Sequence, residues 1–130
     1  MRIGELAKRV QTSVDTIRFY ERAGLLPKPG RTASNYRTYS SVHIERLAFI
    51  RRCRSLDMSL HEIRSLLRLC DEPTRRCDSV NDMLDVHIVQ VELRIDGLQS
   101  LSRELRQLRA VCRAPGKAKN CQVLNILRTA

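Results

Sequence analysis

Residues 3–23 read IGELAKRVQTSVDTIRFYERA, and this stretch decides the fold of the first part of the chain. Its first half carries apolar residues at helical spacing, namely Ile3, Leu6, Ala7 and Val10. Thr12 or Ser13 is then placed to cap a second helix, which runs from Val14 to about Ala23. Two short helices on either side of a tight polar turn predict a helix-turn-helix.

The residues that follow predict a hairpin. Gly24 and the prolines after it end the second helix. Residues 28–40 contain turn formers and then alternating β-formers from Tyr36 to Tyr39. This order is typical of a two-stranded wing.

Two further helices complete this part of the chain. Ser40 or Ser41 begins the third helix, whose apolar residues are Leu47, Ile50 and Leu56. The capping box of Ser59 and Glu62 opens the fourth, which ends at residues 71–73. The residues of the fourth helix expected to face the core are Leu60, Ile63, Leu66 and Leu67.

Residues 79–112 predict one long helix, because they contain no proline. Apolar residues step by four and three along it, first Leu84, Ile88, Val91, Ile95 and Leu98, then Leu101, Leu105, Leu108 and Cys112. This is a coiled-coil seam with one phase slip. No breaker divides the segment into a hairpin, so the seam needs a partner, and a second copy of the chain is the simplest one.

Composition and charge indicate which classes of function the chain can have. The chain has 24 Lys+Arg against 14 Asp+Glu, a net charge of +10, and residues 1–76 hold 16 of these basic and 8 of the acidic residues. Such a head suits a polyanion such as nucleic acid. No apolar run is long enough to span a membrane, and the apolar stretch of a signal peptide is missing, so we expect a cytoplasmic protein. Catalytic and nucleotide-binding motifs are missing too, so we expect no enzyme.

Four motifs resemble the MerR family of bacterial transcription regulators: residues 3–7 (IGELA), 16–21 (TIRFYE), 24–26 (GLL) and 35–39 (NYRTY). The resemblance implies a mainly α fold in which a winged helix-turn-helix head is followed by a long antiparallel coiled-coil dimerisation helix and a C-terminal metal-binding loop. The corresponding domains are residues 1–76, 77–112 and 113–130. The family also implies a homodimer on double-stranded promoter DNA.

The expected DNA-binding residues are Arg18, Tyr20, Arg31, Tyr36, Arg37 and Arg54. Arg18 lies on the exposed side of the second helix and can reach a base edge or a phosphate in the major groove. Arg31 and Arg37 flank the wing tip and would meet the DNA backbone. The alternative for Tyr20 and Tyr36, and for Tyr39 beside them, is packing within the hairpin and core.

Five cysteines in a reducing compartment favour thiols or metal ligands over disulfides. Cys77, before the long helix, and Cys112 and Cys121, around the following loop, resemble the ligands of divalent-metal sensors in this family. Residues 53–60 and 85–88 look most like its lead/cadmium branch. Loop residues 113–120 contain no His or acid. A site of thiolates alone suits lead(II), cadmium(II) or mercury(II). The resemblance to the lead/cadmium branch favours lead(II) among them.

The remaining thiols and imidazoles are expected outside the metal site. Cys53 and Cys70 are interpreted as core packing residues. His43, His61 and His87 show no ligand-like spacing. The alternative for the three candidate ligands is that they are ordinary buried thiols.

The length of the long helix predicts which chain supplies which ligand. From Ser79 to Cys112 is 33 residues, or roughly 50 Å at about 1.5 Å per residue. Cys77 therefore cannot join Cys112 and Cys121 of its own chain, and an antiparallel dimer would supply it from the partner.

The hypothesis is a metal-responsive regulator that activates heavy-metal resistance genes. The resemblance implies that metal binding distorts the promoter and realigns its elements for RNA polymerase. The alternatives are a thiol redox-sensing regulator with a Cys112–Cys121 disulfide, or a soft-metal buffering protein.

Overall fold

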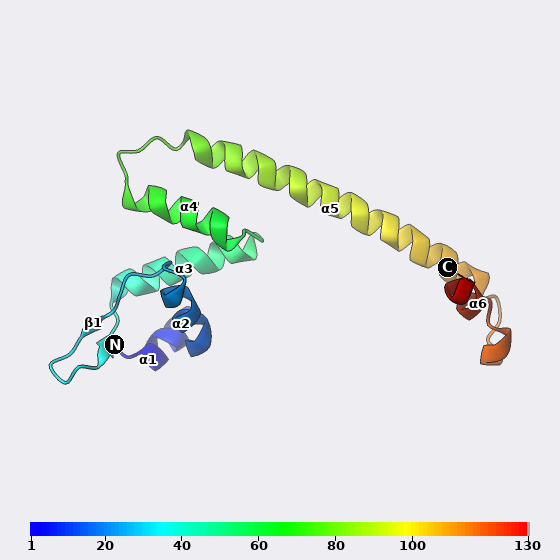
Figure 1. Ribbon diagram of the computed structural model, residues 1–130, viewed down its shortest axis with the longest axis horizontal. Coiled ribbons are helices and arrows are strands. Elements are labelled where there is room, and N and C mark those ends of the chain that lie inside the picture. The colour runs from blue at the N-terminus through cyan, green and yellow to red at the C-terminus, as the bar shows by residue number, and fades with distance from the viewer. Residues whose placement is uncertain (130) are drawn as a thin grey trace. The chain divides into compact units, whose positions relative to one another are not determined.

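The computed structural model describes residues 1–129. Its helices are α1 (Ile3–Val10), α2 (Val14–Arg22), α3 (Ser41–Ser55), α4 (Leu60–Asp71), α5 (Asp78–Val111), the 3₁₀ turn η1 (Ala118–Asn120) and α6 (Gln122–Thr129) (Figure 1). Strands β1 (Gly30–Arg31) and β2 (Arg37–Thr38) form one hairpin. The expected fold class, mainly α with a small wing and a long helix, is confirmed.

The chain divides into two compact units, Met1–Asn81 and Asp82–Ala130. The core of the first unit is formed by six fully buried side chains from α1, α2, the turn after α2, α3 and α4: Leu6, Ile17, Leu25, Leu47, Ile50 and Ile63. Each such side chain contributes about 1.5–3 kcal/mol when it leaves water. This core fixes α1 and α2 against α3.

The helix-turn-helix is held by local caps. Gln11 ends α1 in the left-handed conformation, with φ of 53°. Ser13 caps α2, and its hydroxyl accepts a hydrogen bond from the backbone N–H of Thr16 at 3.1 Å. The turn between the two helices is therefore specified by residues 11–13, as the sequence predicts.

Arginines from α3 and α4 bind the carbonyls at the ends of the first two helices. Arg51 donates to the carbonyl of Val10 at 3.3 Å, and Arg64 donates to that of Ala23 at 2.8 Å. Such carbonyls have no partner within their own helix, so a cation there is favourable. Part of the positive charge of the head is therefore structural.

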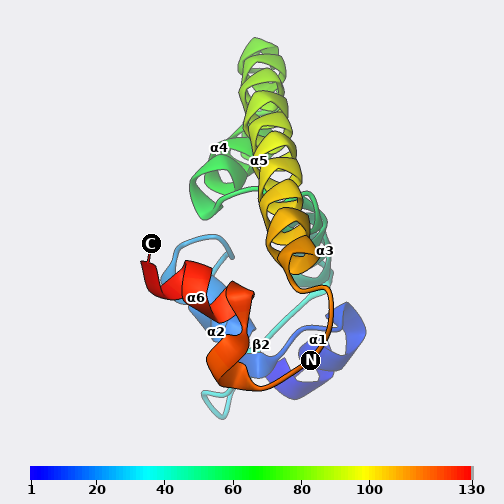
Figure 2. The same ribbon diagram turned by 90° about the vertical axis from the view of Figure 1, so that its right-hand side faces the viewer.

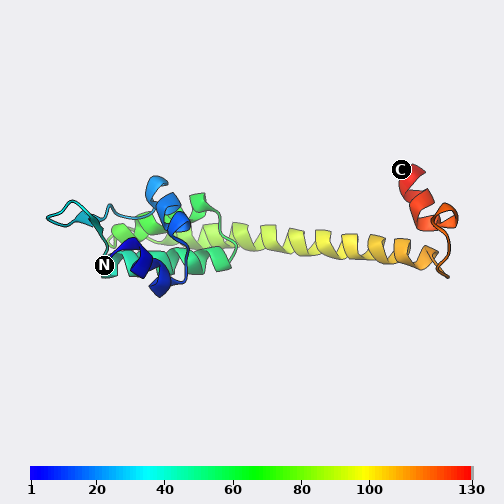
Figure 3. The same cartoon turned by 90° about the horizontal axis from the view of Figure 1, so that it is seen from below.

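The wing is a short antiparallel hairpin that extends from the helices of the first unit (Figure 3). Gly30 pairs with Thr38, and Arg31 pairs with Arg37. Asn35 occupies the tip with a φ of 65°, a conformation that Asn adopts more readily than most residues. The register places both arginines near the tip, as expected.

Two details of the expected third and fourth helices differ in the structure. Leu56 follows the last residue of α3 and is 57% exposed. Cys70 is exposed as well, because the last buried residue of α4 is Leu67 and Cys70 lies in the final turn beyond it. Cys53, in contrast, is buried as predicted.

In the second unit, α5 continues without a break to Val111, and α6 follows the η1 turn (Figure 2). None of the 34 residues of α5 is buried within this one chain. The exposed apolar side chains include Ile88, Ile95, Leu98, Leu101 and Leu105 of the predicted seam. Among residues 1–129 no helix combines the length and the apolar character needed to cross a membrane.

The ion pair between α3 and α4 gives a prediction. Arg46 binds both carboxylate oxygens of Asp71, at 2.7 and 2.9 Å. This hydrogen bonding lowers the pKa of Asp71, so the pair stabilises the fold above the unfolded-state pKa and is lost as pH falls through the folded-state pKa. Asp71→Asn should lower the free energy of unfolding at pH 7 by about 0.5–1 kcal/mol, and the difference should be smaller at about pH 2, as protonation of Asp71 removes the pair.

Urea unfolding at the two pH values measures this difference. Glu45→Gln, which changes an exposed carboxylate on the same helix as Arg46, serves as the control and should leave stability nearly unchanged at both. A deficit in Asp71→Asn that is as large at about pH 2 as at pH 7 would show that the ion pair is not its cause.

Candidate DNA-binding surface and cysteine site

Helix α2 and the wing together form a basic surface. Arg18 and Arg37 are exposed, and both line a pocket of about 220 Å³ together with Arg2 and Tyr36. Tyr20, on α2, is half-buried. The structure thus brings together three of the predicted DNA-binding residues in one concave, positively charged place, which suits a phosphate.

Arg37 is held by an ion pair with α2. Its Nη1 donates to Oε2 of Glu21 at 3.1 Å. The hydroxyl of Tyr39 donates to Oε1 of the same carboxylate. Tyr39 is only 3% exposed, so for this tyrosine the packing alternative is confirmed. Burial, together with this hydrogen bond, raises its pKa and keeps the phenol protonated.

Arg2 is a member of this surface that sequence reasoning missed. Its guanidinium lies 4.6 Å from the centre of the Tyr36 ring, a cation–π contact. Tyr36 is 55% exposed and so does not pack in the core. Arg31, on the facing strand, donates to the carbonyl of Asn35 at 3.1 Å, which steadies the wing tip. The proximity of Arg2 to the wing comes from hydrogen bonds between the backbones of Met1 and Tyr39, which helical periodicity does not reveal.

Arg54 lies in the last turn of α3 and has a structural partner just after that helix. Its Nη1 donates to the carbonyl of Met58 at 2.7 Å and braces the turn between α3 and α4. The side chain is exposed and has further N–H groups. A DNA contact by Arg54 therefore remains a prediction that is compatible with this bond.

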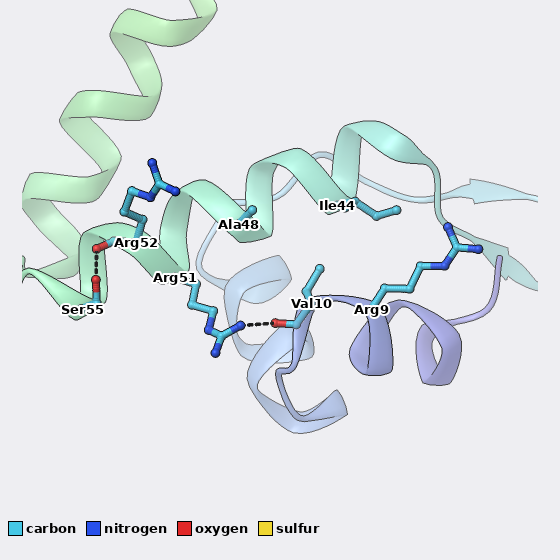
Figure 4. Close-up of a pocket in the computed structure, with 7 residues that line it drawn as sticks. All are labelled: Arg9, Val10, Ile44, Ala48, Arg51, Arg52 and Ser55. Atoms are coloured by element: carbon cyan, nitrogen blue, oxygen red, sulfur yellow. Dashed lines mark hydrogen bonds between the residues drawn. The ribbon is translucent and has the colours of Figure 1, made fainter.

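Helices α1 and α3 enclose a second pocket of about 370 Å³, lined by Arg9, Val10, Ile44, Ala48, Arg51 and Arg52 (Figure 4). Arg51 points toward α1 and binds Val10, whereas Arg52 points away from α1 (Figure 4). The three guanidinium groups do not converge on one point. The pocket thus lacks the arrangement that would hold a single anion.

Two of the three candidate metal ligands line one cavity. Cys112 and Cys121 are both half-buried and border a space of about 420 Å³, which residues 111–124 surround. Its lining contains no Asp, Glu or His. A cavity with sulfur as its only strong donor fits a soft cation such as lead(II), cadmium(II) or mercury(II) better than a hard one.

Cys77, the third candidate, immediately precedes α5 and is exposed, whereas Cys112 immediately follows it. Within residues 1–129 of a single chain, no three Cys, His, Asp or Glu side chains are grouped for a metal ion. The continuous helix of 34 residues explains this, since it spans about 50 Å. A complete site of these three thiols needs a second chain.

Two of the residues that were expected outside the metal site, Cys53 and His43, have structural roles. Burial raises the pKa of the Cys53 thiol, which disfavours the thiolate that a metal needs. His43 is buried at the start of α3, where Nδ1 accepts from the backbone N–H of Ser40 at 3.2 Å and Nε2 lies 3.1 Å from the carbonyl of Pro27.

The burial of Cys53 predicts its reactivity. Iodoacetamide at neutral pH should modify the exposed Cys70 and Cys77 at least about tenfold faster than Cys53, because the thiolate is the reacting species. Mass spectrometry of peptides after timed quenching measures the rates. In denaturant all five rates should converge. Equal rates for Cys53 and Cys77 in the folded protein would contradict the packing of α3.

Comparisons with known proteins show the family of the chain. Residues 1–70 match the family model "MerR HTH family regulatory protein", and residues 44–108 match the model "MerR, DNA binding". The chain is 50% identical to the transcription regulator PbrR691 from Ralstonia metallidurans CH34, solved in complex with lead(II), over 98% of both chains with a TM-score of 0.89.

Two further relatives show the breadth of the similarity. The mercury(II) complex of the dual function transcriptional regulator MerR from Bacillus megaterium MB1 is 29% identical, over 98% of this chain and 99% of that one, with a TM-score of 0.74. An "HTH-type transcriptional regulator ZntR homolog" of Haemophilus influenzae is 47% identical over 109 residues, which cover 84% of this chain and 81% of the relative. The chain therefore belongs to the MerR family of helix-turn-helix transcriptional regulators.

Proposed function

We propose that this protein is a metal-responsive transcriptional activator of heavy-metal resistance genes in the bacterial cytoplasm. The observation that carries the proposal is the cavity of Cys112 and Cys121, which offers thiols without carboxylate or imidazole on a chain with a DNA-binding head. Relatives solved with lead(II) and mercury(II) support it. DNA binding and metal sensing then reside in different parts of the same chain.

On DNA, α2 enters the major groove and presents Arg18 to a base edge or a phosphate. Arg2 and Arg37, which share the pocket with Arg18, bind the adjacent backbone. Tyr20 donates its hydroxyl to a phosphate, and the remaining contacts come from the wing and from the end of α3, namely Arg31, Tyr36 and Arg54. Two heads of a homodimer would bind two half-sites of double-stranded promoter DNA.

The charge distribution of α5 supports an antiparallel dimer. Residues 78–96 contain five acidic residues and one basic residue, whereas residues 97–111 contain one acidic and three basic ones. A parallel pair would place like charges side by side along the helix. An antiparallel pair places the acidic half of one helix beside the basic half of its partner, and opposite flanking charges of this kind set orientation in coiled coils.

In that dimer the metal site is shared between subunits. The start of one α5 lies beside the end of the other, so Cys77 of the partner subunit reaches the cavity of Cys112 and Cys121. Three thiolates hold a divalent ion, and this donor set suits lead(II), cadmium(II) or mercury(II). The similarity to the relative solved with lead(II) favours lead(II) as the effector. A dimer carries two such sites.

The shared site couples metal binding to a change in the shape of the promoter DNA. Binding ties the loop of one chain to the segment that joins the other chain's DNA-binding head to its α5. Drawing these segments together moves the heads, and the two heads then untwist and bend the promoter between them. DNA deformability thereby becomes the switch that realigns promoter elements for RNA polymerase.

Arg37 tests the DNA-binding surface. Arg37→Ala should weaken binding to the operator by about tenfold and lower the slope of log affinity against log salt by about 1, because it removes one phosphate contact. Fluorescence anisotropy from 50 to 300 mM salt measures both. Arg128→Ala, which removes the same charge from α6, should alter neither. An unchanged affinity and slope for Arg37→Ala would refute the wing assignment.

Subunit mixing tests the shared site. Neither Cys77→Ser nor the double variant Cys112→Ser/Cys121→Ser should form a three-thiolate site alone. After subunit exchange, heterodimers should regain one complete site. The charge-transfer absorption of a lead–thiolate complex reports it.

Two controls accompany the mixing experiment. Tagged chains confirm that exchange occurred, and a mixture of Cys77→Ser with the triple variant Cys77→Ser/Cys112→Ser/Cys121→Ser should recover nothing. Confirmed exchange without recovery of the absorption band in the first mixture would rule out a site made from two chains.

A further inference from the structure

Glu21 is an acidic residue in the last turn of the proposed recognition helix, and both of its carboxylate oxygens are occupied. Oε1 accepts from the hydroxyl of Tyr39, and Oε2 accepts from Arg37 Nη1 at 3.1 Å. The Glu21 side chain is only 13% exposed, whereas that of Arg37 is 49% exposed. The carboxylate therefore joins a buried anchor on one side to a solvent-facing arginine on the other.

The anchor is firmly placed. Tyr39 is 3% exposed, its ring packs at 5.1 Å against the ring of His43, and its backbone N–H donates to the carbonyl of Met1 at 2.7 Å. Helix α2 and strand β2 thus meet at one carboxylate, and Tyr39 connects it to the start of α3. Through that carboxylate, the position of Arg37 is fixed relative to Arg18, which lines the same pocket.

A negative charge at this place opposes the binding of a polyanion. Coulomb repulsion alone would make Glu21 unfavourable for affinity toward any DNA. Its geometry offers a compensating gain, because an arginine that is already oriented loses less side-chain freedom when it binds a phosphate.

We propose that Glu21 is a positioning residue for DNA recognition, which holds Arg37 of the wing at a set distance from α2 before DNA arrives. The inference rests on the proposed function in one respect, the contact between Arg37 and a phosphate. It goes beyond that contact by assigning specificity to a residue that touches no DNA. Glu21 then favours the operator, whose backbone fits the preset spacing, over other duplexes.

Glu21→Gln distinguishes positioning of Arg37 from charge repulsion, because loss of the two effects changes operator affinity in opposite directions. If Glu21 positions Arg37, the variant binds the operator about 5- to 10-fold more weakly, the scale of one ordinary hydrogen bond, although it has lost a repulsive charge. Its affinity for a scrambled duplex of the same length stays equal or rises. Glu45→Gln, at an exposed carboxylate of α3, is the matched charge control and should weaken neither. Tighter operator binding by Glu21→Gln would overturn the proposal.

A double-mutant cycle separates positioning from general structure. In the Arg37→Ala background, Glu21→Gln should change operator affinity by less than about twofold, since the residue acts through Arg37. A full additional loss in that background would overturn the positioning role. An Arg37→Ala protein that binds the operator normally would instead overturn the proposed phosphate contact itself.

The same experiment includes a control for the folding of each variant. Thermal unfolding of each variant ensures that binding is measured on folded protein. Should Glu21→Gln not fold, Glu21→Asp keeps the charge but withdraws the carboxylate by one methylene. This variant should also weaken operator binding, and unchanged binding by it would overturn the proposal.

Discussion

Helix α5 runs unbroken for 34 residues and buries none of them within one chain. An apolar stripe of this length in water is unfavourable by an amount that scales with its area, so the helix requires a second surface. The same rigid length keeps Cys77 and Cys112 at opposite ends of the element. One constraint thus accounts both for the proposed dimer and for the absence of a three-ligand cluster within residues 1–129 of a single chain.

The basic head uses its arginines for two purposes. Arg46, Arg51 and Arg64 bind backbone carbonyls and hold the helix-turn-helix against α3 and α4. Arg2, Arg18 and Arg37 line the pocket between α2 and the wing. Net charge alone does not separate these groups, so it overstates the charge available to DNA. The pocket, rather than the total charge, indicates the proposed DNA-binding surface.

Much of the fold could be predicted because its signals are local. Ser13 and Ser59 cap their helices as the sequence indicates, and the spacing of apolar residues gives the extent of α5. The errors at Leu56 and Cys70 have a common origin. Helical periodicity identifies which face of a helix is apolar, but it does not show where the neighbouring element ends.

Less of the candidate site could be predicted from the sequence. Cys112 and Cys121 share a cavity because a short loop joins them, and their proximity could be predicted. The contact of Glu21 with Arg37 spans 16 positions, and that of Arg64 with Ala23 spans 41, so neither follows from local pattern. The third proposed thiol, Cys77, was indicated by the family resemblance, and the length of α5 predicts that a second chain would supply it.

The central claim is that metal held by thiols from two chains activates transcription without being needed for DNA binding. In vitro transcription from the operator promoter, titrated with lead(II), tests it most directly when wild-type protein is compared with Cys77→Ser. The account predicts that both proteins occupy the operator equally and that only the wild type raises transcript yield as lead(II) is added. Equal activation of Cys77→Ser at the same free lead(II) concentration would contradict it.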